Sequence, residues 1–546
     1  VGAISVVGTF LVLRLLASVT DVSIFALNLT TAMSLGLSID YSLFIVSRYR
    51  EELRKGREPH DAVVRTVETA GKTVAFSALT VGVALAAMAV FPLVFLRSFA
   101  YAGVGVAIMC AVGAVICLPA MLAVLGPRVD SLVLWRHTPK PEGQGAWHRV
   151  AMFVMRRPVL VGSAVIALLL VLGAPFFNIV IGIPDDRVLP ASAPSHQVQN
   201  DIRRSFASRE ASALQVVAPN LRDSSGTTAK AKITTYAGRL SALPGVARVD
   251  ASTGSYAGGK QVVGPGTLTA RFTSRTADGT WLSVVPTVEP DSPQGEALAQ
   301  RVRDLTAPSA VLVGGPSARL VDSKASLFSK LPLALGIIAI ATFFLLFMMF
   351  GGILVPIKAL VINVLSLSAT FGAIVFVFQE GHLSKLLDFT ATGAIAATMP
   401  ILMFCVAFGL SMDYEVFLLS RIKEEHDRTG DNTASVALGL ERTGRIVTGA
   451  ALLISVVFLA FATSGVMFIK MFGLGLALAV LLDAFVIRAT LVPAFMRLAG
   501  EANWWAPGPM RRFYLRYGIR ESAEPDAFDL AQTPEADPRE PASAGS

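Results

Sequence analysis

Two short segments of the sequence place an aspartate and a tyrosine inside apolar runs, 373 residues apart (413 − 40). The first, LSIDYSLFIVSRYREEL, holds Asp40 and Tyr41, and the second, LSMDYEVFLLSRIKEEH, holds Asp413 and Tyr414. An aspartate at the centre of a membrane helix costs about 2.5–3.5 kcal/mol, and such residues are usually functional. Burial favours a protonated carboxyl, whereas a phenol that donates a hydrogen bond favours the ionised form. The chemistry indicated is the binding and release of protons inside a membrane.

The spacing to nearby arginines predicts how deep the two aspartates lie. Arg48 is expected near the membrane surface, and eight helical residues between Asp40 and Arg48 span about 12 Å. Half of the hydrocarbon core is about 15 Å, so Asp40 is expected near the midplane, and Asp413 likewise. Consecutive helical residues point in different directions. We therefore expect crossed pairs on two facing helices, Asp40 with Tyr414 and Asp413 with Tyr41.

A polar clamp between helices, without proton movement, is the alternative reading of these pairs. Hydrogen bonds between membrane helices average about 0.6 kcal/mol, far less than the cost of inserting the carboxylates. We therefore favour a proton relay.

Other polar residues in the apolar runs are weaker candidates. Ser77, Thr80 and Thr448 could support the relay, although membrane serines and threonines more often serve packing and backbone bonding. Asp483 lies five residues before Arg488, and an intrahelical or interfacial ion pair is favoured over a direct role. The three cysteines lie in apolar runs, and no metal or nucleophile motif is present. We expect no cofactor, no metal site and no enzymatic activity.

The composition predicts a membrane protein. Of 546 residues, 53% are hydrophobic and 16% are charged, whereas soluble proteins carry about 25% charged residues. The formal charge of +8 does not indicate nucleic-acid binding, because the basic residues cluster beside apolar segments, where they set topology.

About ten runs are apolar enough to cross a bilayer of about 30 Å. They lie near 1–18, 29–47, 73–91, 96–125, 158–180, 331–350, 353–378, 391–420, 446–464 and 468–497. Connections rich in arginine and lysine alternate with connections that are poor in them. The positive-inside rule then predicts a multi-pass protein of the plasma membrane with a cytoplasmic C-terminus.

The sequence therefore divides into six parts. We expect an incomplete first transmembrane repeat of about four helices (1–126), a cytoplasmic loop (127–157), a transmembrane helix (158–180), an extracytoplasmic α+β domain (181–330), a second repeat of about five helices (331–498) and a cytoplasmic tail with a disordered acidic end (499–546).

Alternating and amphipathic patterns predict the elements of the α+β domain. Strands are expected at ALQVVAP, VARVDAS, LTARFTS, WLSVVPTV and AVLVGG. Helices are expected at SHQVQNDIRRSF, TAKAKITTYAGRLSAL and GEALAQRVRDLT.

A tandem duplication explains why the motif occurs twice. The same offset maps Arg48 onto Arg421 and Glu51 onto Glu424, with further matches over about a hundred positions. Repeats of equal orientation predict a pseudo-two-fold axis along the membrane normal. The counterparts of 158–350 would precede Val1. A complete duplication would have roughly twelve spans and two external domains, so we expect a truncated chain, either a fragment or a sequence whose start is wrongly assigned.

Three stretches resemble the MMPL family of the RND transporter superfamily: GLSIDYSLFIVSRYREELRKG, TAGKTVAFSALTVGVALAAM and LLDAFVIRATLVPAFMRLAGEANWW. The resemblance implies a polytopic α-helical membrane protein with porter-like external domains, and the crossed pairing of Asp40, Tyr41, Asp413 and Tyr414. Family members are proton-driven exporters of lipids or hydrophobic compounds in the plasma membrane, common in mycobacteria and related actinobacteria. This chain departs from the pattern by lacking the first span, the first external domain and the second span.

Two functions follow as hypotheses. The first is export of lipids or hydrophobic compounds by alternating access, driven by protons that each yield about 2.3 kcal/mol per 100 mV. Its partners would be the cargo, protons, membrane lipids and, for some members, further copies or accessory proteins. The alternative is a transport-inactive accessory protein, scaffold or lipid sensor with the same fold.

Overall fold

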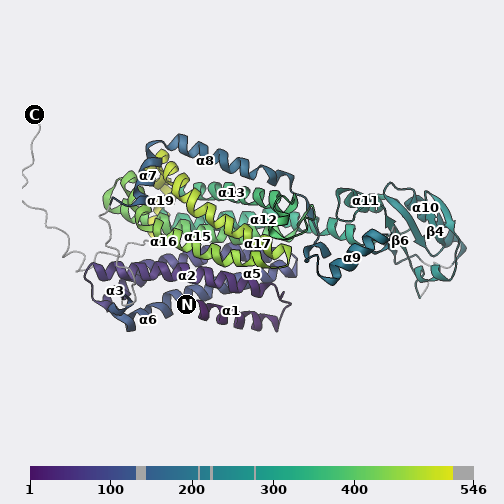
Figure 1. Ribbon diagram of the computed structural model, residues 1–546, viewed down its shortest axis with the longest axis horizontal. Helices are drawn as coiled ribbons and strands as arrows, with labels where there is room; N and C mark the ends of the chain where they lie inside the picture. The colour runs from purple at the N-terminus through teal and green to yellow at the C-terminus, as the bar shows by residue number, and fades with distance from the viewer. Residues whose placement is uncertain (131–142, 207–208, 222–225, 276–277, 520–546) are drawn as a thin grey trace, which may run out of the picture.

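The computed structural model describes residues 1–130, 143–206, 209–221, 226–275 and 278–519 as a bundle of long helices with a smaller sheet domain at one end (Figure 1). Within this part of the chain, nine helices are long and apolar enough to cross a membrane. They confirm nine of the ten expected apolar runs, and the first run forms a shorter apolar helix, Gly2–Ala17. The expected disordered end of the tail falls outside the described residues.

The first repeat is built from α1 to α6. The third and fourth of its spans each contain one π-helical turn, at Val67–Gly71 and Gly113–Cys117. The helices are α1 (Gly2–Ala17), α2 (Ala26–Arg54), α3 (Pro59–Thr66), α4 (Lys72–Ala86), α5 (Val94–Val112) and α6 (Leu118–Leu125).

The second repeat follows the same order of helices and carries a π-helical segment, Leu482–Leu491, in the corresponding span. Its helices are α12 (Pro316–Phe350), α13 (Leu354–Ile374), α14 (Ser384–Leu387), α15 (Thr398–Thr429), α16 (Asn432–Ala460), α17 (Met467–Leu481) and α18 (Val492–Ala499). Outside the repeats, the described part of the bundle also contains α7 (Ala146–Arg156), α8 (Pro158–Gly173) and α19 (Gly508–Tyr517). One backbone irregularity is therefore shared by the two repeats, since Leu482–Leu491 lies where the first repeat has Gly113–Cys117.

The turn between α15 and α16 shows how local sequence sets helix ends. Gly430 adopts a left-handed conformation with φ of 70°, which suits a glycine at a helix C-terminus. The Asp431 side chain then accepts hydrogen bonds from the backbone N–H groups of Thr433 and Ala434, at 2.8 and 3.1 Å. This N-cap satisfies two donors that a helix start leaves open.

Helix α15 is the central span of the bundle. It packs against α4, α16 and α17, and 89% of its apolar window is buried, compared with at most 67% for the other spans in the described residues. A polar side chain on α15 is therefore held inside protein and away from lipid.

The sheet domain contains a six-stranded antiparallel sheet in the order β5-β4-β3-β6-β2-β7, within the residues described. The strands are β2 (Leu214–Ala218), β3 (Val246–Ala251), β4 (Gly254–Ala257), β5 (Lys260–Val263), β6 (Thr280–Pro286) and β7 (Leu312–Gly314). Its helices are α9 (Pro194–Ser205), α10 (Thr227–Ser241) and α11 (Pro293–Asp304). Apolar side chains of β2 and β6, such as Leu214 and Val284, form one core with those of α10 and α11.

Most of the elements expected in this domain are confirmed, with one error and one omission. LTARFTS is not a strand, because Thr267–Phe272 winds into a 3₁₀ helix in which the Thr269 hydroxyl bonds to the backbone of Gly266. Phe272 alone is its apolar anchor, packed on Trp281. The hairpin β4–β5 was not expected; its turn is Gly258-Gly259, with positive φ at both residues.

Two connections join the sheet domain to the bundle. Helix α12 is continuous from Pro316 to Phe350, so it starts within the domain and not near residue 331. A two-stranded parallel ribbon pairs β1 (Ile181–Gly182) with β8 (Ile395–Ala396). The Gln379 side chain fixes the start of this ribbon by bonding to the backbone of Val180 and Asn178, at 2.8 and 2.9 Å.

A substitution at the α8–α13 contact tests the packing of the bundle. A Cβ at Gly372 would lie 2.0 Å from the carbonyl oxygen of Leu172, so Gly372→Val forces the two backbones apart. Overpacking of this kind costs about 1–3 kcal/mol. We expect a loss of several degrees in thermal unfolding temperature in detergent. Gly336→Val is the matched control, because a Cβ there meets no atom within 4 Å; equal losses for both variants would contradict the packing.

Candidate functional site

The two Asp-Tyr motifs meet at the centre of the bundle, where α2 faces α15. Asp40, Tyr41, Asp413 and Tyr414 are all buried, with exposures of 3%, 0%, 0% and 1%. The helices contact each other here through side chains, because Tyr41 packs edge-on against Phe417, with ring centroids 6.3 Å apart. Four ionisable groups from two repeats therefore share one buried site.

The pairing within this site is crossed. Tyr414 is the phenol next to Asp40, and Tyr41 is the phenol next to Asp413. None of the four side chains makes a hydrogen bond of regular distance and angle. The geometry is thus one of close but loose contacts, in which each carboxyl has a phenol from the other repeat within reach.

A small cavity adjoins the Asp40–Tyr414 pair on the side of α16. It measures about 10 Å³, close to the least volume that holds one water molecule. Its walls include Phe44, Phe417 and Thr443. Phe44 and Phe417 occupy equivalent positions in the two repeats and stack with ring centroids 4.4 Å apart.

The supporting polar residues divide into near and distant ones. Ser77 lies next to Tyr41, and neither hydroxyl makes a hydrogen bond of regular geometry. Thr80 donates to the carbonyl oxygen of Ser77 at 2.7 Å, which is backbone bonding within one helix. Thr448 likewise donates to the carbonyl oxygen of Gly444 at 2.7 Å. Only Ser77 of these three is brought to the relay.

Asp483 forms the ion pair that its spacing to Arg488 suggests. The two side chains are 2.7 Å apart and almost fully buried. Ser411 donates a hydrogen bond to Asp483 at 2.9 Å. The guanidinium carbon of Arg488 lies 5.3 Å from the ring centroid of Tyr414, and its charge acts on Asp413. The pair therefore places a cation beside one half of the relay.

The first repeat has a neutral pair at the equivalent place. The offset of 373 residues maps Ser38 onto Ser411 and Cys110 onto Asp483. The Ser38 hydroxyl lies 3.7 Å from the Cys110 sulfur, so the spatial relation is kept while the charge is not. The two aspartates of the relay consequently have different electrostatic surroundings.

A second buried ion pair on α15 was not singled out from the sequence. Lys358 on α13 lies 3.0 Å from Glu415, with side-chain exposures of 0% and 6%. A lysine inside the apolar run 353–378 and a glutamate directly after Asp413-Tyr414 are the sequence signals that indicate it.

Two cavities lie on opposite sides of the β1–β8 ribbon, at the end of the bundle next to the sheet domain. The first is apolar, measures about 270 Å³ and is lined by α12, α13 and α15 together with Ile179 and Ile181. The second measures about 320 Å³ and is lined by Val180 and Gly182. Because successive strand residues point to opposite faces, the ribbon separates the two spaces.

The second cavity is amphipathic. Its floor is formed by Met467, Phe468 and Met471, and its wall carries Asp185, Arg187, Glu289 and Asp291. Arg187 is paired with Asp185 at 2.6 Å, so it is largely neutralised. Burial and the neighbouring Asp185 anion raise the pKa of the Asp291 carboxyl above its ordinary value. Three carboxylates against one arginine give this wall a negative balance.

Together, the membrane-spanning bundle, the duplicated helices and the sheet domain define a polytopic membrane protein with a porter-like domain. The chain belongs to the MMPL family, whose pattern it matches over residues 1–161 and 187–525. Members of this family are transporters and not enzymes.

Relatives of known name support this assignment. Putative membrane protein SCO6666 of Streptomyces coelicolor is 39% identical over 523 residues, covering 96% of this chain and 69% of that protein. The trehalose monomycolate exporter MmpL3 of Mycobacterium tuberculosis is 32% identical over 580 residues, covering 100% of this chain and 59% of that protein. The chain thus spans more than half, but not all, of the length of these relatives.

A solved structure shares the fold. SecDF of Thermus thermophilus, a translocon-associated membrane protein, aligns over 91% of this chain and 58% of its own length. The TM-score is 0.51 and the sequence identity is 14%, so the likeness concerns the fold alone.

The Lys358–Glu415 pair can be tested by unfolding. Lys358→Met leaves Glu415 as an unpaired buried charge, and breaking a buried pair in this way costs about 3–5 kcal/mol. We expect a marked fall in thermal unfolding temperature in detergent. The double variant Lys358→Met/Glu415→Gln removes both charges and should recover most of the loss. A double variant as unstable as the single one would show that the pair contributes through packing and not through charge.

Proposed function

We propose that this chain exports lipids or hydrophobic compounds by alternating access and that the proton-motive force drives it. The observation that carries the proposal is the pair of buried Asp-Tyr contacts, each made between the two repeats. Proton uptake or release at such a site changes the charge at the interface between two bodies that move in alternating access. Similarity to MmpL3, named as a trehalose monomycolate exporter, supports lipid as the class of cargo.

Charge distribution supports an orientation for this transport. The end of the bundle remote from the sheet domain carries Arg48, Arg54, Arg156, Arg421 and Arg428, among others. The positive-inside rule places that end in the cytoplasm and the sheet domain outside the plasma membrane. Helix α19, with Arg511, Arg512 and Arg516, then lies at the inner leaflet.

The asymmetry between the two aspartates assigns them different parts in the proton cycle. Asp413 has the Arg488 cation close by, since the Arg488 guanidinium lies over the ring of the adjacent Tyr414. Asp40 has a phenol and a small cavity but no equivalent cation among the described residues around it. In our proposal Asp40 is therefore the group that gains and loses the transported proton most readily, and its charge state decides whether α2 and α15 stay in contact.

The two cavities suggest how an amphipathic cargo is held. Hydrocarbon chains suit the apolar cavity, whose lining among the described residues carries one hydroxyl group, that of Ser368. A headgroup suits the amphipathic cavity beyond the ribbon. Its negative balance disfavours anionic headgroups, so we propose a cargo whose polar part is neutral or cationic.

The relay is tested by removing one carboxylate at a time. Asp40→Asn or Asp413→Asn keeps the shape of the side chain but cannot lose a proton, so export should fall at least ten-fold. The measurement is transfer of a headgroup-labelled fluorescent lipid in proteoliposomes that hold a pH gradient. Asp201→Asn, on the exposed surface of α9, is the control and should export as the unmodified chain does.

Near-normal export by either asparagine variant would overturn the proton relay. If the unmodified chain itself binds lipid but moves none under a pH gradient, the accessory or lipid-sensing function becomes the better explanation. Correct insertion of each variant is checked by gel filtration and thermal unfolding.

The apolar cavity is tested by filling it. Val364→Trp places a large side chain at its wall, so binding of a fluorescent acyl probe should weaken at least five-fold. Val361→Trp is the control. Val361 lies on the same helix as Val364 and has a similar exposed fraction, 62% against 54%, but it does not line the cavity. Equal binding by both variants would exclude this cavity as the acyl site.

A further inference from the structure

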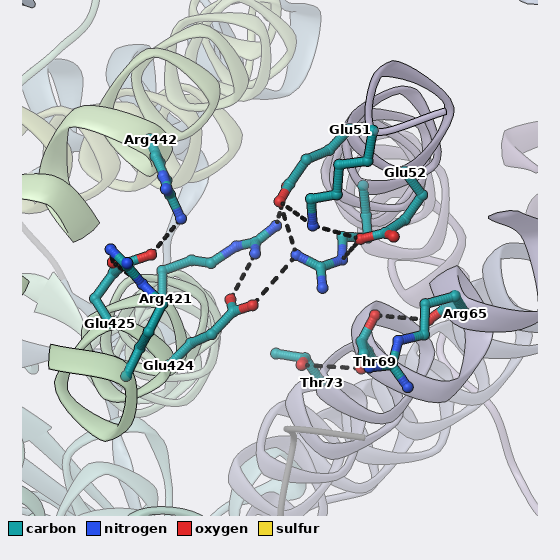
Figure 2. A network of polar contacts seen from close by, with 12 residues as sticks. Glu51, Glu52, Arg65, Thr69, Thr73, Arg421, Glu424, Glu425 and Arg442 are labelled. Carbon is teal, nitrogen blue, oxygen red and sulfur yellow. Dashed lines mark hydrogen bonds and ion pairs between the residues drawn. The ribbon is translucent and has the colours of Figure 1, made fainter. Parts of the chain in front are cut away.

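A closed ring of four charged side chains joins α2 and α15 at the end of the bundle remote from the sheet domain (Figure 2). Arg421 contacts Glu424 at 2.6 Å on its own helix and Glu51 at 3.0 Å on α2. Arg48 contacts Glu51 at 3.1 Å on its own helix and Glu424 at 3.4 Å on α15. Each arginine thus holds one local glutamate and one from the other repeat.

The ring repeats the symmetry of the relay. The offset of 373 residues maps Arg48 onto Arg421 and Glu51 onto Glu424. Both arginines are buried, with side-chain exposures of 6% and 9%, while the two glutamates are about 30% exposed. The ring therefore borders solvent on one side and protein on the other.

The stacked pair Phe44–Phe417 lies between the relay and the ring. Along α2, Asp40, Phe44 and Arg48 follow one another at intervals of four residues, which places them on one helix face. The guanidinium of Arg421 also lies over the ring of Phe44, 5.9 Å from its centroid. Carboxylates, aromatic rings and ion pairs thus form three successive layers between the two repeats.

Neighbouring acidic residues fix each half of the ring to its own repeat. Glu52 is paired with Arg57 at 2.9 Å within the first repeat. Figure 2 shows the pair that Glu425 forms with Arg442 of α16 within the second repeat. These pairs do not cross the interface between the repeats. When the repeats move apart, each half of the ring should therefore move as part of its own body.

The crossed contacts can open at low cost in free energy. If α2 and α15 separate, Arg48 keeps Glu51 and Glu52, and Arg421 keeps Glu424. No buried charge is then left without a partner. Breaking a buried ion pair is expensive when one of its charges stays buried and unpaired, and that does not happen here. The two glutamates of the crossed contacts are about 30% exposed, so water can solvate them once the contacts open.

We propose that Arg48, Glu51, Arg421 and Glu424, with Phe44 and Phe417 above them, form the gate that closes the proton relay toward the cytoplasm. This inference rests on the proposed function, because a proton path is what the gate controls. The gate keeps water from the relay while α2 and α15 are in contact. Separation of the two repeats breaks the two crossed contacts and lets a proton leave.

The test measures access to the relay by a reporter that needs no transport. Thr443 lines the small cavity beside Asp40, and Thr443→Cys is a change of nearly equal size. The three native cysteines are replaced, and the background must unfold at the temperature of the unmodified chain. A water-soluble thiol reagent is then applied from the side of the ring.

The ring variant is Glu51→Gln/Glu424→Gln, which removes both crossed attractions and keeps side-chain size. We expect labelling of the cysteine at 443 to become at least five-fold faster. The control, Glu68→Gln/Asp427→Asn, removes one half-exposed carboxylate from each repeat at the same end and should leave the rate unchanged. A folded ring variant labelled at the rate of the control overturns the gate.

A second readout separates the gate from the proposed function. In proteoliposomes without cargo, the ring variant should collapse a pH gradient several-fold faster than the control, and Asp40→Asn in the same chain should abolish that leak. If labelling becomes faster but the leak survives Asp40→Asn, the ring does keep water out. The proposal that it lies on the proton path through Asp40 is then overturned. If the unmodified chain shows no proton-driven export while labelling still depends on the ring, the proposed function fails and the ring still keeps water out.

Discussion

A charge inside a bilayer is stable only beside a group that compensates it, and this requirement explains where the charged side chains of the bundle lie. Helix α15 carries Asp413, Glu415, Arg421 and Glu424 along its length, and it is also the most buried of the described spans. Each of these side chains faces another helix and not lipid. The neighbours of α15 supply the compensating groups: a phenol from α2, a lysine from α13 and a guanidinium from the span that follows α17.

The duplication supplies compensating residues at equivalent positions of both repeats, but the charges of the two repeats are not symmetric. The ring and the aromatic pair are built twice from equivalent residues, and so is the crossed relay. The layer beyond the relay is different, because Cys110 stands in the first repeat where Asp483 stands in the second. A structural two-fold axis therefore passes through an electrostatically uneven site.

Much of this arrangement follows from the sequence, and the exceptions have physical reasons. Long apolar runs predicted the spans, and the constant offset predicted that Asp40 and Asp413 meet with exchanged tyrosines. The sequence did not reveal the Lys358–Glu415 pair, because nothing local says which of several helices will face a buried lysine. It also misassigned LTARFTS, where alternation of apolar and polar residues resembled a strand but local hydrogen bonds of Thr269 favoured a 3₁₀ turn. The two cavities could not be predicted at all, since each is lined by segments far apart in the chain.

Helix α12 has a consequence for how the two parts of the molecule move. It packs on β2, β7 and α11 at one end and on α4, α13 and α15 at the other. Its 35 residues form a rod about 52 Å long, so a tilt of about 10° displaces one end by about 9 Å relative to the other. Pro332 lies within the rod and removes one backbone hydrogen bond there. The helix is thus one continuous connection between bundle and sheet domain, so a tilt of its membrane end is passed on to the sheet domain, and Pro332 is the point where it bends most easily.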